Sequence, residues 1–345
     1  MKLFVQAALE FGRRYPVKYL WTLSRMCAAA DGQRMALKRD LPALKLAILA
    51  YDLQVPGEVL LALESMGIRT VALNERPQSV VWEMQPFAAS ILLTASDTFS
   101  AFALASRSVS VGQVVSVGMW RTDFLCEYRL QQGHALQREA RRKGLKFIVA
   151  LPFHASEEGE AGSSPLETSP QAVRHFLLDL VNIAEESSKV FIVIRGKNDL
   201  WVKDERFADV VQSIDRISNI VISRDYDTLN ESYRLCAWAD LVLAKHTSLV
   251  DEVLSVGIPC VIHDYTTNSS DLSRLLVPYL PREIWAEDAR ELRQRVEFAL
   301  AGEGRQFTQW WEPHRRRIYS DLNDGHVRVR ARAFMASLAE GGNQR

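Results

Sequence analysis

The stretch Val221–Asp264, VISRDYDTLNESYRLCAWADLVLAKHTSLVDEVLSVGIPCVIHD, decides the fold of this protein. Residues 237–244 (AWADLVLA) end a helix and enter a buried strand, and a polar turn follows. Residues 249–256 repeat apolar residues at helical spacing, and a glycine and a proline directly afterwards stop that helix. Residues 260–263 begin the next strand. This order of strand, turn, helix and strand predicts a parallel α/β layer.

The polar turn consists of Lys245, His246, Thr247 and Ser248. A turn of this kind exposes backbone N–H groups at the start of a helix, and these groups and the helix dipole favour an anion, commonly a phosphate. Thr247 and Ser248 can cap the helix and also hydrogen-bond that phosphate. Glu252, one turn inside the helix, is expected near a sugar hydroxyl. The alternative is that the hydroxyls are only caps and that the acidic residues only complement the helix dipole.

Composition excludes several classes of protein. A length of 345 residues suggests two domains, and 48% hydrophobic residues suffice for sizeable cores. The net charge of zero gives no sign of a nucleic-acid partner. The four cysteines lack metal-ligand spacing and fit a reducing cytoplasm. No apolar run reaches the length of a membrane span.

Residues 2–38 are expected to be helical, with a break near Pro16. Aromatic and basic residues alternate along this segment. A helix of this composition can lie on an anionic membrane surface, which would place the protein on the inner face of the membrane. A helix of this kind more often packs against its own domain.

Two series of strands and helices follow, and we expect an α/β protein with two Rossmann-like parallel-sheet domains facing a cleft. The first, small domain covers residues 1–140 and the second covers residues 141–345. A polar helix over 125–143 connects them, and residues 155–170 form a mobile loop. The expected strands are residues 46–50, 69–73, 90–94 and 114–117 in the first domain and 146–151, 189–194 and 220–223 in the second, which continues with the strand that ends at residue 244 and the strand over 260–263.

Polar residues follow every expected strand of the second domain. Ligands of open α/β sheets bind beyond the carboxyl ends of the strands. Two closely spaced cations suit a pyrophosphate. Each strand end taken singly fits a solvated surface, but all five together favour a phosphate site. The strand-end residues include His154, Arg195 and Lys197, Arg224 and Tyr226, the turn from Lys245 to Ser248, and His263 with Asp264.

Two residues are candidates for acid–base chemistry. Glu75 follows a strand of the first domain, and a carboxylate in a closed cleft can accept a proton from an acceptor hydroxyl. It can instead form a surface pair with Arg76. His154 follows a strand and precedes the mobile loop, and loops of that kind can close over a bound substrate.

Several motifs are missing from the sequence. It has no dinucleotide fingerprint, no Walker A sequence, no HExxH and no GxSxG. These absences weigh against dehydrogenases, P-loop kinases, zinc proteases and α/β hydrolases. No carboxylate pair has the spacing of a metal site. Helix dipoles and basic side chains can stabilise a departing phosphate, so we expect neither metal nor cofactor.

Three stretches resemble GT-B-fold glycosyltransferases, in particular bacterial surface-polysaccharide transferases and CDP-glycerol glycerophosphotransferases. Residues 118–123 (GMWRTD) are similar to the GxPRxD segment that ends the first domain in that group, which implies that Arg121 and Asp123 lie at the cleft. Residues 226–240 and 247–259 resemble the stretch in which a Ser-Ser or Ser-Thr turn holds the donor's phosphate. Residues 192–197 (IVIRGK) occupy the place of a Lys-x-His-Pro segment.

Both catalytic histidines of the glycerophosphotransferases are missing at their usual positions. Lys197 replaces one, and Asn74-Glu75 stands near the place of the other. The resemblance therefore implies a cytoplasmic glycosyltransferase that moves a sugar from a nucleotide-activated donor to a growing surface glycan or lipid-linked acceptor, with Glu75 or another carboxylate as the base. The donor would lie on Arg195, Lys197, Tyr226, Thr247, Ser248 and Glu252.

Two other interpretations stay open. A nucleotide-sugar epimerase of the same fold would need neither an acceptor nor a membrane. A catalytically degenerate transferase domain could serve as a partner module in an assembly complex, and the missing histidines motivate that reading.

Overall fold

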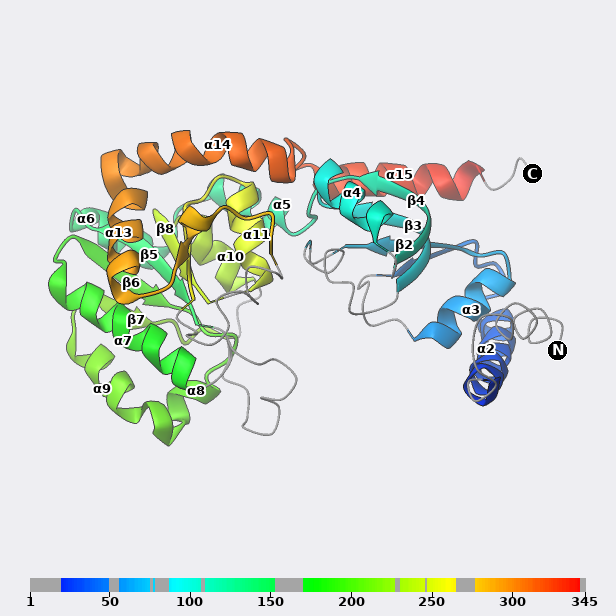
Figure 1. Cartoon of the computed structure of the whole chain (residues 1–345), viewed down its shortest axis with the longest axis horizontal. Helices are drawn as coiled ribbons and strands as arrows, with labels where there is room; N and C mark the ends of the chain where they lie inside the picture. The colour runs from blue at the N-terminus through cyan, green and yellow to red at the C-terminus, as the bar shows by residue number, and fades with distance from the viewer. Residues whose placement is uncertain are drawn as a thin grey trace. The chain divides into compact units, whose positions relative to one another are not determined.

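The chain forms two compact units, each built on a parallel sheet (Figure 1). Unit 1 comprises Met1–Met119 and Arg328–Arg345, and unit 2 comprises Trp120–Val327. The division falls before residue 140, and the C-terminal segment belongs to unit 1. The computed structural model describes residues 20–49, 56–74, 77, 87–106, 109–152, 170–226, 230–245, 247–264 and 277–341.

Unit 1 contains a four-stranded parallel sheet with the order β1-β2-β3-β4. The four strands overlap those expected from the sequence, because each is a short apolar run between polar or turn residues. α4 begins directly after β3 and leads back to β4. The elements are α2 (Leu20–Asp40), β1 (Leu46–Leu49), α3 (Gly57–Ser65), β2 (Arg69–Leu73), β3 (Phe87–Thr94), α4 (Asp97–Ala105), β4 (Val109–Ser116) and α15 (Val327–Gly341).

The helix α15 completes the core of unit 1. Its Ala331 joins a buried cluster with Val71 of β2 and Ile91 of β3, and Phe334 packs against that cluster. The guanidinium of Arg330 donates to the carbonyl oxygen of Val117 at 3.2–3.3 Å. The last helix in the sequence therefore covers a sheet formed by the first part of the chain.

The described part of the N-terminal helix is α2, which packs against α3. It ends with Lys38 and Arg39 in its last turn, where positive charge complements the helix dipole. Residues 2–19, which hold most of the basic and aromatic residues expected on a membrane surface, lie outside the described residues.

Unit 2 contains a six-stranded parallel sheet with the order β10-β9-β8-β5-β6-β7. Continuous apolar runs such as KFIVAL and VFIVI form its central strands, because helices cover both faces of a parallel sheet. The short strand β10 was not expected from the sequence. The strands are β5 (Lys146–Leu151), β6 (Val190–Ile194), β7 (Ile220–Ile222), β8 (Leu241–Ala244), β9 (Cys260–His263) and β10 (Trp285–Ala286).

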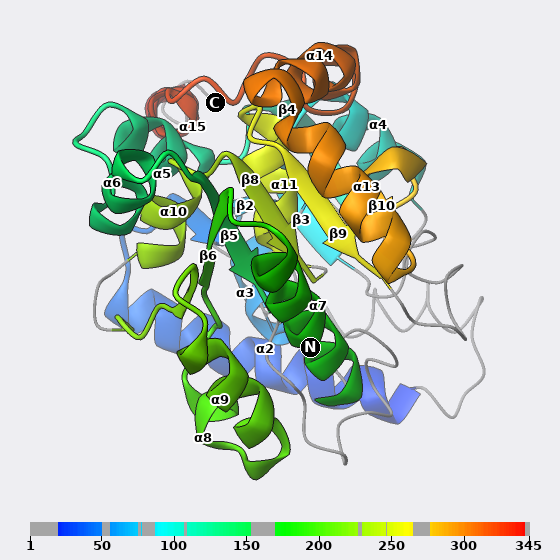
Figure 2. The same cartoon turned by 90° about the vertical axis from the view of Figure 1, so that its left-hand side faces the viewer.

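Helices cover both faces of this sheet (Figure 2). On one face α7 and α13 lie side by side, joined by an ion pair of 2.7 Å between Glu186 and Arg293. On the other face α10 and α11 pack with α5. The helices are α5 (Thr122–Arg129), α6 (Ala135–Arg142), α7 (Pro170–Glu186), α8 (Leu200–Lys203), α9 (Ala208–Arg216), α10 (Glu231–Cys236), α11 (Ser248–Ser255), α13 (Ala289–Leu300) and α14 (Arg305–Tyr319). Short 3-10 turns cover Glu205–Phe207, Arg282–Ile284 and Ala301–Gly304.

The helix expected over 125–143 is two helices. α5 ends near Arg129 and α6 begins at Ala135. His134 caps α6, since its Nδ1 accepts a hydrogen bond from the backbone N–H of Leu136 at 3.2 Å. Its Nε2 lies 2.8 Å from the buried carboxylate of Glu231 on α10. His134 is thus a structural cap rather than a solvated residue.

Candidate functional site

The strand order of unit 2 reverses between β5 and β8. The chain runs outward through β5, β6 and β7 and then returns to place β8 on the other side of β5. The loops beyond the carboxyl ends of two such strands diverge, and ligands of open α/β sheets bind in the space between them. In this sheet that position lies beyond Leu151 of β5 and Ala244 of β8.

The turn Lys245–Ser248 begins at this point and leads into α11. Thr247 is the N-cap residue of α11 and has an extended backbone (φ −147°, ψ 152°), but its side chain makes no cap hydrogen bond. The expected cap bond of Thr247 is therefore absent. Because this side chain does not occupy the N–H groups of the first turn, those groups and the helix dipole favour an anion there.

The carboxylate of Asp251 holds α11 in place. It accepts hydrogen bonds from the hydroxyls of Tyr279 at 3.1 Å and of Tyr319 at 2.5 Å. All three side chains are buried. Burial and the neighbouring Asp251 raise the pKa of both tyrosines, so both remain hydrogen-bond donors. This network fixes the direction of the helix that carries Ser248 at its start.

Glu252 lies in the same helix and is 1% exposed. It hydrogen-bonds Tyr233 of α10, and Arg121 at the start of α5 also interacts with that hydroxyl. Burial is the main cause that raises the pKa of Tyr233, and the Glu252 carboxylate raises it further. The structure thus brings together Glu252 and Arg121, which the sequence analysis had assigned to the donor site and the cleft respectively.

Lys245 is fully buried at the end of β8. Its Nζ lies 3.5 Å from Nδ1 of His263, the last residue of the adjacent strand β9. The Nε2 atom of His263 lies 3.0 Å from Oδ2 of Asp179 on α7, and the Phe176 ring packs against the imidazole in a T-shaped arrangement. Lysine, histidine and aspartate therefore form a continuous chain from the turn to α7.

The His263 imidazole is neutral in this setting. Its pKa is lowered to about 4, mainly by burial; the hydrogen bond to Asp179 works in the opposite direction, and the Lys245 charge adds to the lowering. A neutral imidazole carries one N–H, and the carboxylate facing Nε2 selects the tautomer protonated there. Nδ1 is then an acceptor directed at the ammonium of Lys245.

Arg195 and Tyr226 meet at the ends of β6 and β7. The Arg195 guanidinium lies 4.3 Å from the centre of the Tyr226 ring and donates to the carbonyl oxygen of Asp225 at 2.6 Å. Arg195 is 8% exposed, whereas Lys197 is exposed to solvent. The two cations expected to act together therefore differ in their exposure to solvent. Arg195 is fixed between strand ends, and Lys197 stays free to reach a ligand.

Gly196 packs beneath the indole of Trp201. A Cβ at this position would lie 2.5 Å from Nε1 of Trp201 and 2.9 Å from the carbonyl oxygen of Asn198. Gly196→Ala is therefore expected to destabilise the protein by about 1–3 kcal/mol, because the indole must shift. Urea denaturation measures the change in unfolding free energy. Gly32→Ala, whose added Cβ meets nothing within 4 Å, is the control, and equal stability of both variants would contradict this packing argument.

Asp123 has a structural role in unit 2. Its side chain is 1% exposed, and Oδ1 accepts a hydrogen bond from the backbone N–H of Val327 at 3.0 Å. This contact caps the beginning of α15. The expected place of Asp123 at the cleft stays a prediction.

Three expected site residues, Glu75, His154 and His246, lie outside the described residues, and their roles stay predictions. The sequence analysis did not predict the contact between two further residues at these strand ends, His263 and Asp179. His263 was recognised only as the end of a strand. Asp179 was not considered, although an acid inside the apolar run FLLDLVNI was a signal of a buried polar contact.

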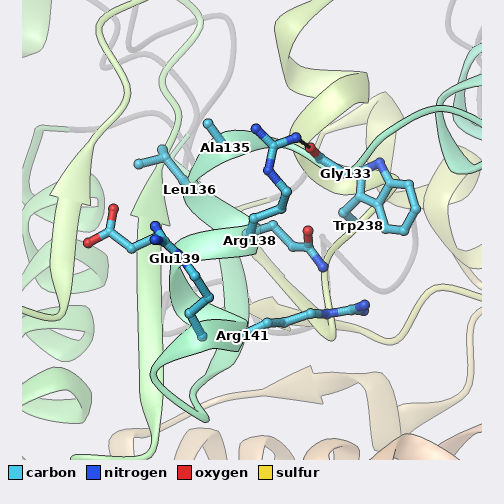
Figure 3. Close-up of a pocket in the computed structure, with 9 residues that line it drawn as sticks. Gly133, Ala135, Leu136, Arg138, Glu139, Arg141 and Trp238 are labelled. Atoms are coloured by element: carbon cyan, nitrogen blue, oxygen red, sulfur yellow. Dashed lines mark hydrogen bonds between the residues drawn. The ribbon is translucent and has the colours of Figure 1, made fainter.

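A hollow of about 900 Å³ lies elsewhere in unit 2, beside α6 (Figure 3). Its wall includes Arg138, whose guanidinium donates to the carbonyl oxygen of Gly133 at 2.8 Å, and Trp238, which faces Arg141 at 6.0 Å. None of the expected site residues lines this hollow. It is separate from the carboxyl ends of the strands.

Within the described ranges, no group of three or more histidine, cysteine, aspartate or glutamate side chains is arranged to hold a metal ion. Cys236 and Cys260 are buried free thiols, and burial raises the pKa of both. None of the helices in the described part of the chain combines the length and apolar character needed to cross a membrane.

Comparison with solved structures shows the fold. A UDP-N-acetylglucosamine 2-epimerase aligns with a TM-score of 0.55 and 12% identity, over 96% of this chain and 80% of that chain. The Neisseria meningitidis UDP-GlcNAc 2-epimerase bound to UDP-GlcNAc aligns with a TM-score of 0.53 and 12% identity, over 88% and 80% respectively. The chain thus has the GT-B type of fold, with two parallel-sheet α/β domains.

The wall teichoic acid polymerase TagF aligns at 13% identity over 73% of this chain and 59% of that chain, with a TM-score of 0.48 that is too low to support an argument. No protein-family model matches the chain, and no curated protein sequence matches it.

Proposed function

We propose that this chain is an enzyme that acts on a nucleotide-activated sugar, with the phosphates bound at the turn Lys245–Ser248. One observation carries the proposal. This turn leads into the N-terminus of α11 at the reversal of strand order, Thr247 makes no cap bond there, and a fully buried lysine opens the turn. An enzyme of the same fold binds UDP-GlcNAc, which supports a ligand of this class.

The proposed reaction is sugar transfer without a metal ion. The hydroxyl of an acceptor attacks the anomeric carbon of the donor, and the bond between that carbon and the phosphate oxygen breaks. The electron pair stays on the leaving nucleotide, where the backbone N–H groups of α11 and the Lys245 ammonium stabilise the charge. Glu75 takes the proton of the acceptor hydroxyl.

Other residues are assigned to the same donor. Lys197 reaches a phosphate from the end of β6, Arg195 holds Tyr226 beside the nucleotide, and Glu252 with Tyr233 lies behind the start of α11. The acceptor is a growing bacterial surface glycan or a lipid-linked sugar. The basic N-terminal segment would hold the enzyme at the inner face of the membrane.

A second candidate function is epimerisation of a nucleotide sugar. Enzymes that carry out this reaction share the fold over four-fifths of their own length, which favours this alternative as much as transfer. The two functions differ in their need for an acceptor. An epimerase converts a free nucleotide sugar by itself, and NMR of the anomeric proton detects the epimer, whereas a transferase releases the nucleotide only when an acceptor is present.

A thermal-shift screen against CMP, CDP, UDP, GDP and ADP tests the nucleotide site. We expect one of them to stabilise the protein, by about 2.7 kcal/mol at a concentration of 100 times Kd. The double variant Thr247→Ala/Ser248→Ala should lower the affinity about tenfold, because two hydroxyl contacts to phosphate are lost. Ser213→Ala, which removes a hydroxyl from α9, is the matched control and should keep the full shift.

The outcome distinguishes the enzyme interpretation from the partner-module interpretation. If folded protein shows no shift in melting temperature with any nucleotide, the proposed function is wrong and the partner-module interpretation is favoured. If a shift occurs but survives in the double variant, a nucleotide binds elsewhere and the turn is not its site.

A further inference from the structure

We propose that the hollow beside α6 binds an anionic sugar chain, at a place separate from the proposed nucleotide site. Arg141 and Arg142 end α6 just before the start of β5, and Trp238 precedes the start of β8. The hollow therefore borders the amino ends of these parallel strands, whereas the turn Lys245–Ser248 follows a carboxyl end. The inference goes beyond the proposed nucleotide reaction and can be tested apart from it.

The wall of the hollow carries more positive than negative charge. Three arginines of α6 line it and are exposed to solvent, namely Arg138, Arg141 and Arg142. Among the residues that the structure describes, no carboxylate oxygen lies within 4 Å of any of the three guanidinium groups. The acid on the same wall is Glu139, which pairs with Lys143 at 2.8 Å. The hollow therefore attracts an anion.

A second acid lies close to this wall without reversing its charge. Asp240 borders an adjoining hollow of about 340 Å³ together with Arg141 and Lys146. Its Oδ2 accepts a hydrogen bond from the backbone N–H of Phe147 at 2.8 Å. The two adjoining hollows thus keep an excess of positive charge.

An aromatic ring lies beside the arginines. The guanidinium carbon of Arg141 lies 6.0 Å from the centre of the Trp238 ring, and Cδ2 of the indole would lie 3.7 Å from a Cβ at Gly133. Arg138 donates to the carbonyl oxygen of the same glycine at 2.8 Å. Figure 3 shows Arg138 and Arg141 extending on the side of α6 that faces Trp238, with the Glu139 carboxylate directed to the other side. Cations and an apolar ring face therefore share one concave surface.

These groups fit a ligand that combines rings with acidic groups. Guanidinium groups bind carboxylate or phosphate oxygens through paired hydrogen bonds, and an indole offers a flat apolar face to the C–H face of a sugar ring. Arg138 stands three and four positions before Arg141 and Arg142, so neighbouring Cβ atoms are about 5–6 Å apart and the cations form a row. A row of cations suits a chain with an acid on successive rings better than it suits a single phosphate.

The shape and the backbone of the hollow disfavour other anionic partners. A volume of about 900 Å³ has the size of a pocket for a ligand of several rings, and a flat membrane surface does not enter a concave hollow. An extended acidic peptide needs partners for its own N–H and C=O groups. The backbone of α6 is engaged within the helix, and the carbonyl oxygen of Gly133 already accepts from Arg138.

Microscale thermophoresis with tetragalacturonate, which carries one carboxylate on each ring, tests the inference, and neutral maltotetraose is the control ligand. We expect tetragalacturonate to bind at least about tenfold more tightly than maltotetraose. The double variant Arg141→Gln/Arg142→Gln should lose about tenfold in affinity for it, because two charge-assisted contacts are removed. Arg216→Gln, a change at an exposed arginine on α9 outside the hollow, should lose less than twofold.

Substitutions of Trp238 test the ring contact, and thermal unfolding checks that all variants fold. Trp238→Ala should lose about fivefold in affinity for tetragalacturonate, whereas Trp238→Phe, which keeps an aromatic face, should lose about twofold. Equal losses for the two variants would contradict stacking of a sugar ring on this side chain.

Several results would overturn the inference. These are no binding of tetragalacturonate by folded protein, equal binding of the charged and neutral tetramers, and full affinity in Arg141→Gln/Arg142→Gln. Equal affinity for tetraglutamate would identify an acidic peptide as the occupant instead of a sugar chain. The same double variant should keep the full thermal shift with nucleotide, and losing that shift would place the nucleotide in this hollow. The absence of any nucleotide shift in the wild type would contradict the proposed function alone.

Discussion

Lys245→Met is expected to lower the affinity for the nucleotide about 100-fold. The ammonium contributes a charge-assisted contact to phosphate, and losing such a contact costs about 2–3 kcal/mol. The same ammonium is fully buried and contacts His263, and removing one partner of a buried polar contact can also destabilise the fold, so the stability of the unliganded variant is measured separately.

Calorimetry with the nucleotide and urea denaturation without it measure the two quantities. Lys203→Met is the control, because it removes the same charge from an exposed position on α8, 2.5 Å from Asp199. It should change the affinity less than twofold. Equal affinity losses for the two lysine variants would show that the change in net charge alone causes the effect. An unchanged affinity for Lys245→Met would show that Lys245 does not contact the nucleotide.

Acid is expected to destabilise the protein between pH 6.5 and pH 4 through His263. The ordinary pKa of a histidine is 6.5, and burial lowers that of His263 to about 4. In this window the unfolded chain binds a proton at this residue and the native state does not, so stability falls as the pH falls. A difference of this size corresponds to roughly 3 kcal/mol, which is fully lost at about pH 4.

Urea denaturation at several pH values checks this. His263→Gln should flatten the slope of unfolding free energy against pH in this window, whereas His175→Gln, a change at an exposed histidine on α7, should not. Lys245→Met should reduce the slope in part, because the Lys245 charge lowers the His263 pKa and is not the first cause of the shift. A slope that survives in His263→Gln would show that another group causes the acid sensitivity.

The local parts of the fold could be predicted from the sequence. The strand Lys146–Leu151, the strand Cys260–His263 and the helix after the turn lie where their patterns place them, within one residue. Such elements depend on side chains a few positions apart, and apolar runs between turn residues report those contacts. The expectation of two parallel-sheet domains follows from the alternation of these elements, and the comparisons bear it out.

The resemblance in the turn also led to the correct fold. Thr247 and Ser248 stand before α11 as expected, although the cap bond of Thr247 is absent. A capping preference states how often a hydroxyl binds the helix start, and not whether the surrounding backbone brings it within reach.

By itself the sequence determined five of the six strands of the second sheet and the polar residues at their ends. Only the tertiary structure decided which ends meet. The contact between His263 and Asp179 joins residues 84 positions apart, and Lys245 finds His263 only because β8 and β9 pair in register. Likewise α15 packs on strands from the opposite end of the chain. The periodicity of apolar residues indicates which face of a helix or strand is buried. The partner of a buried polar side chain depends instead on how whole strands and helices pack, and no fixed spacing in the sequence predicts that packing.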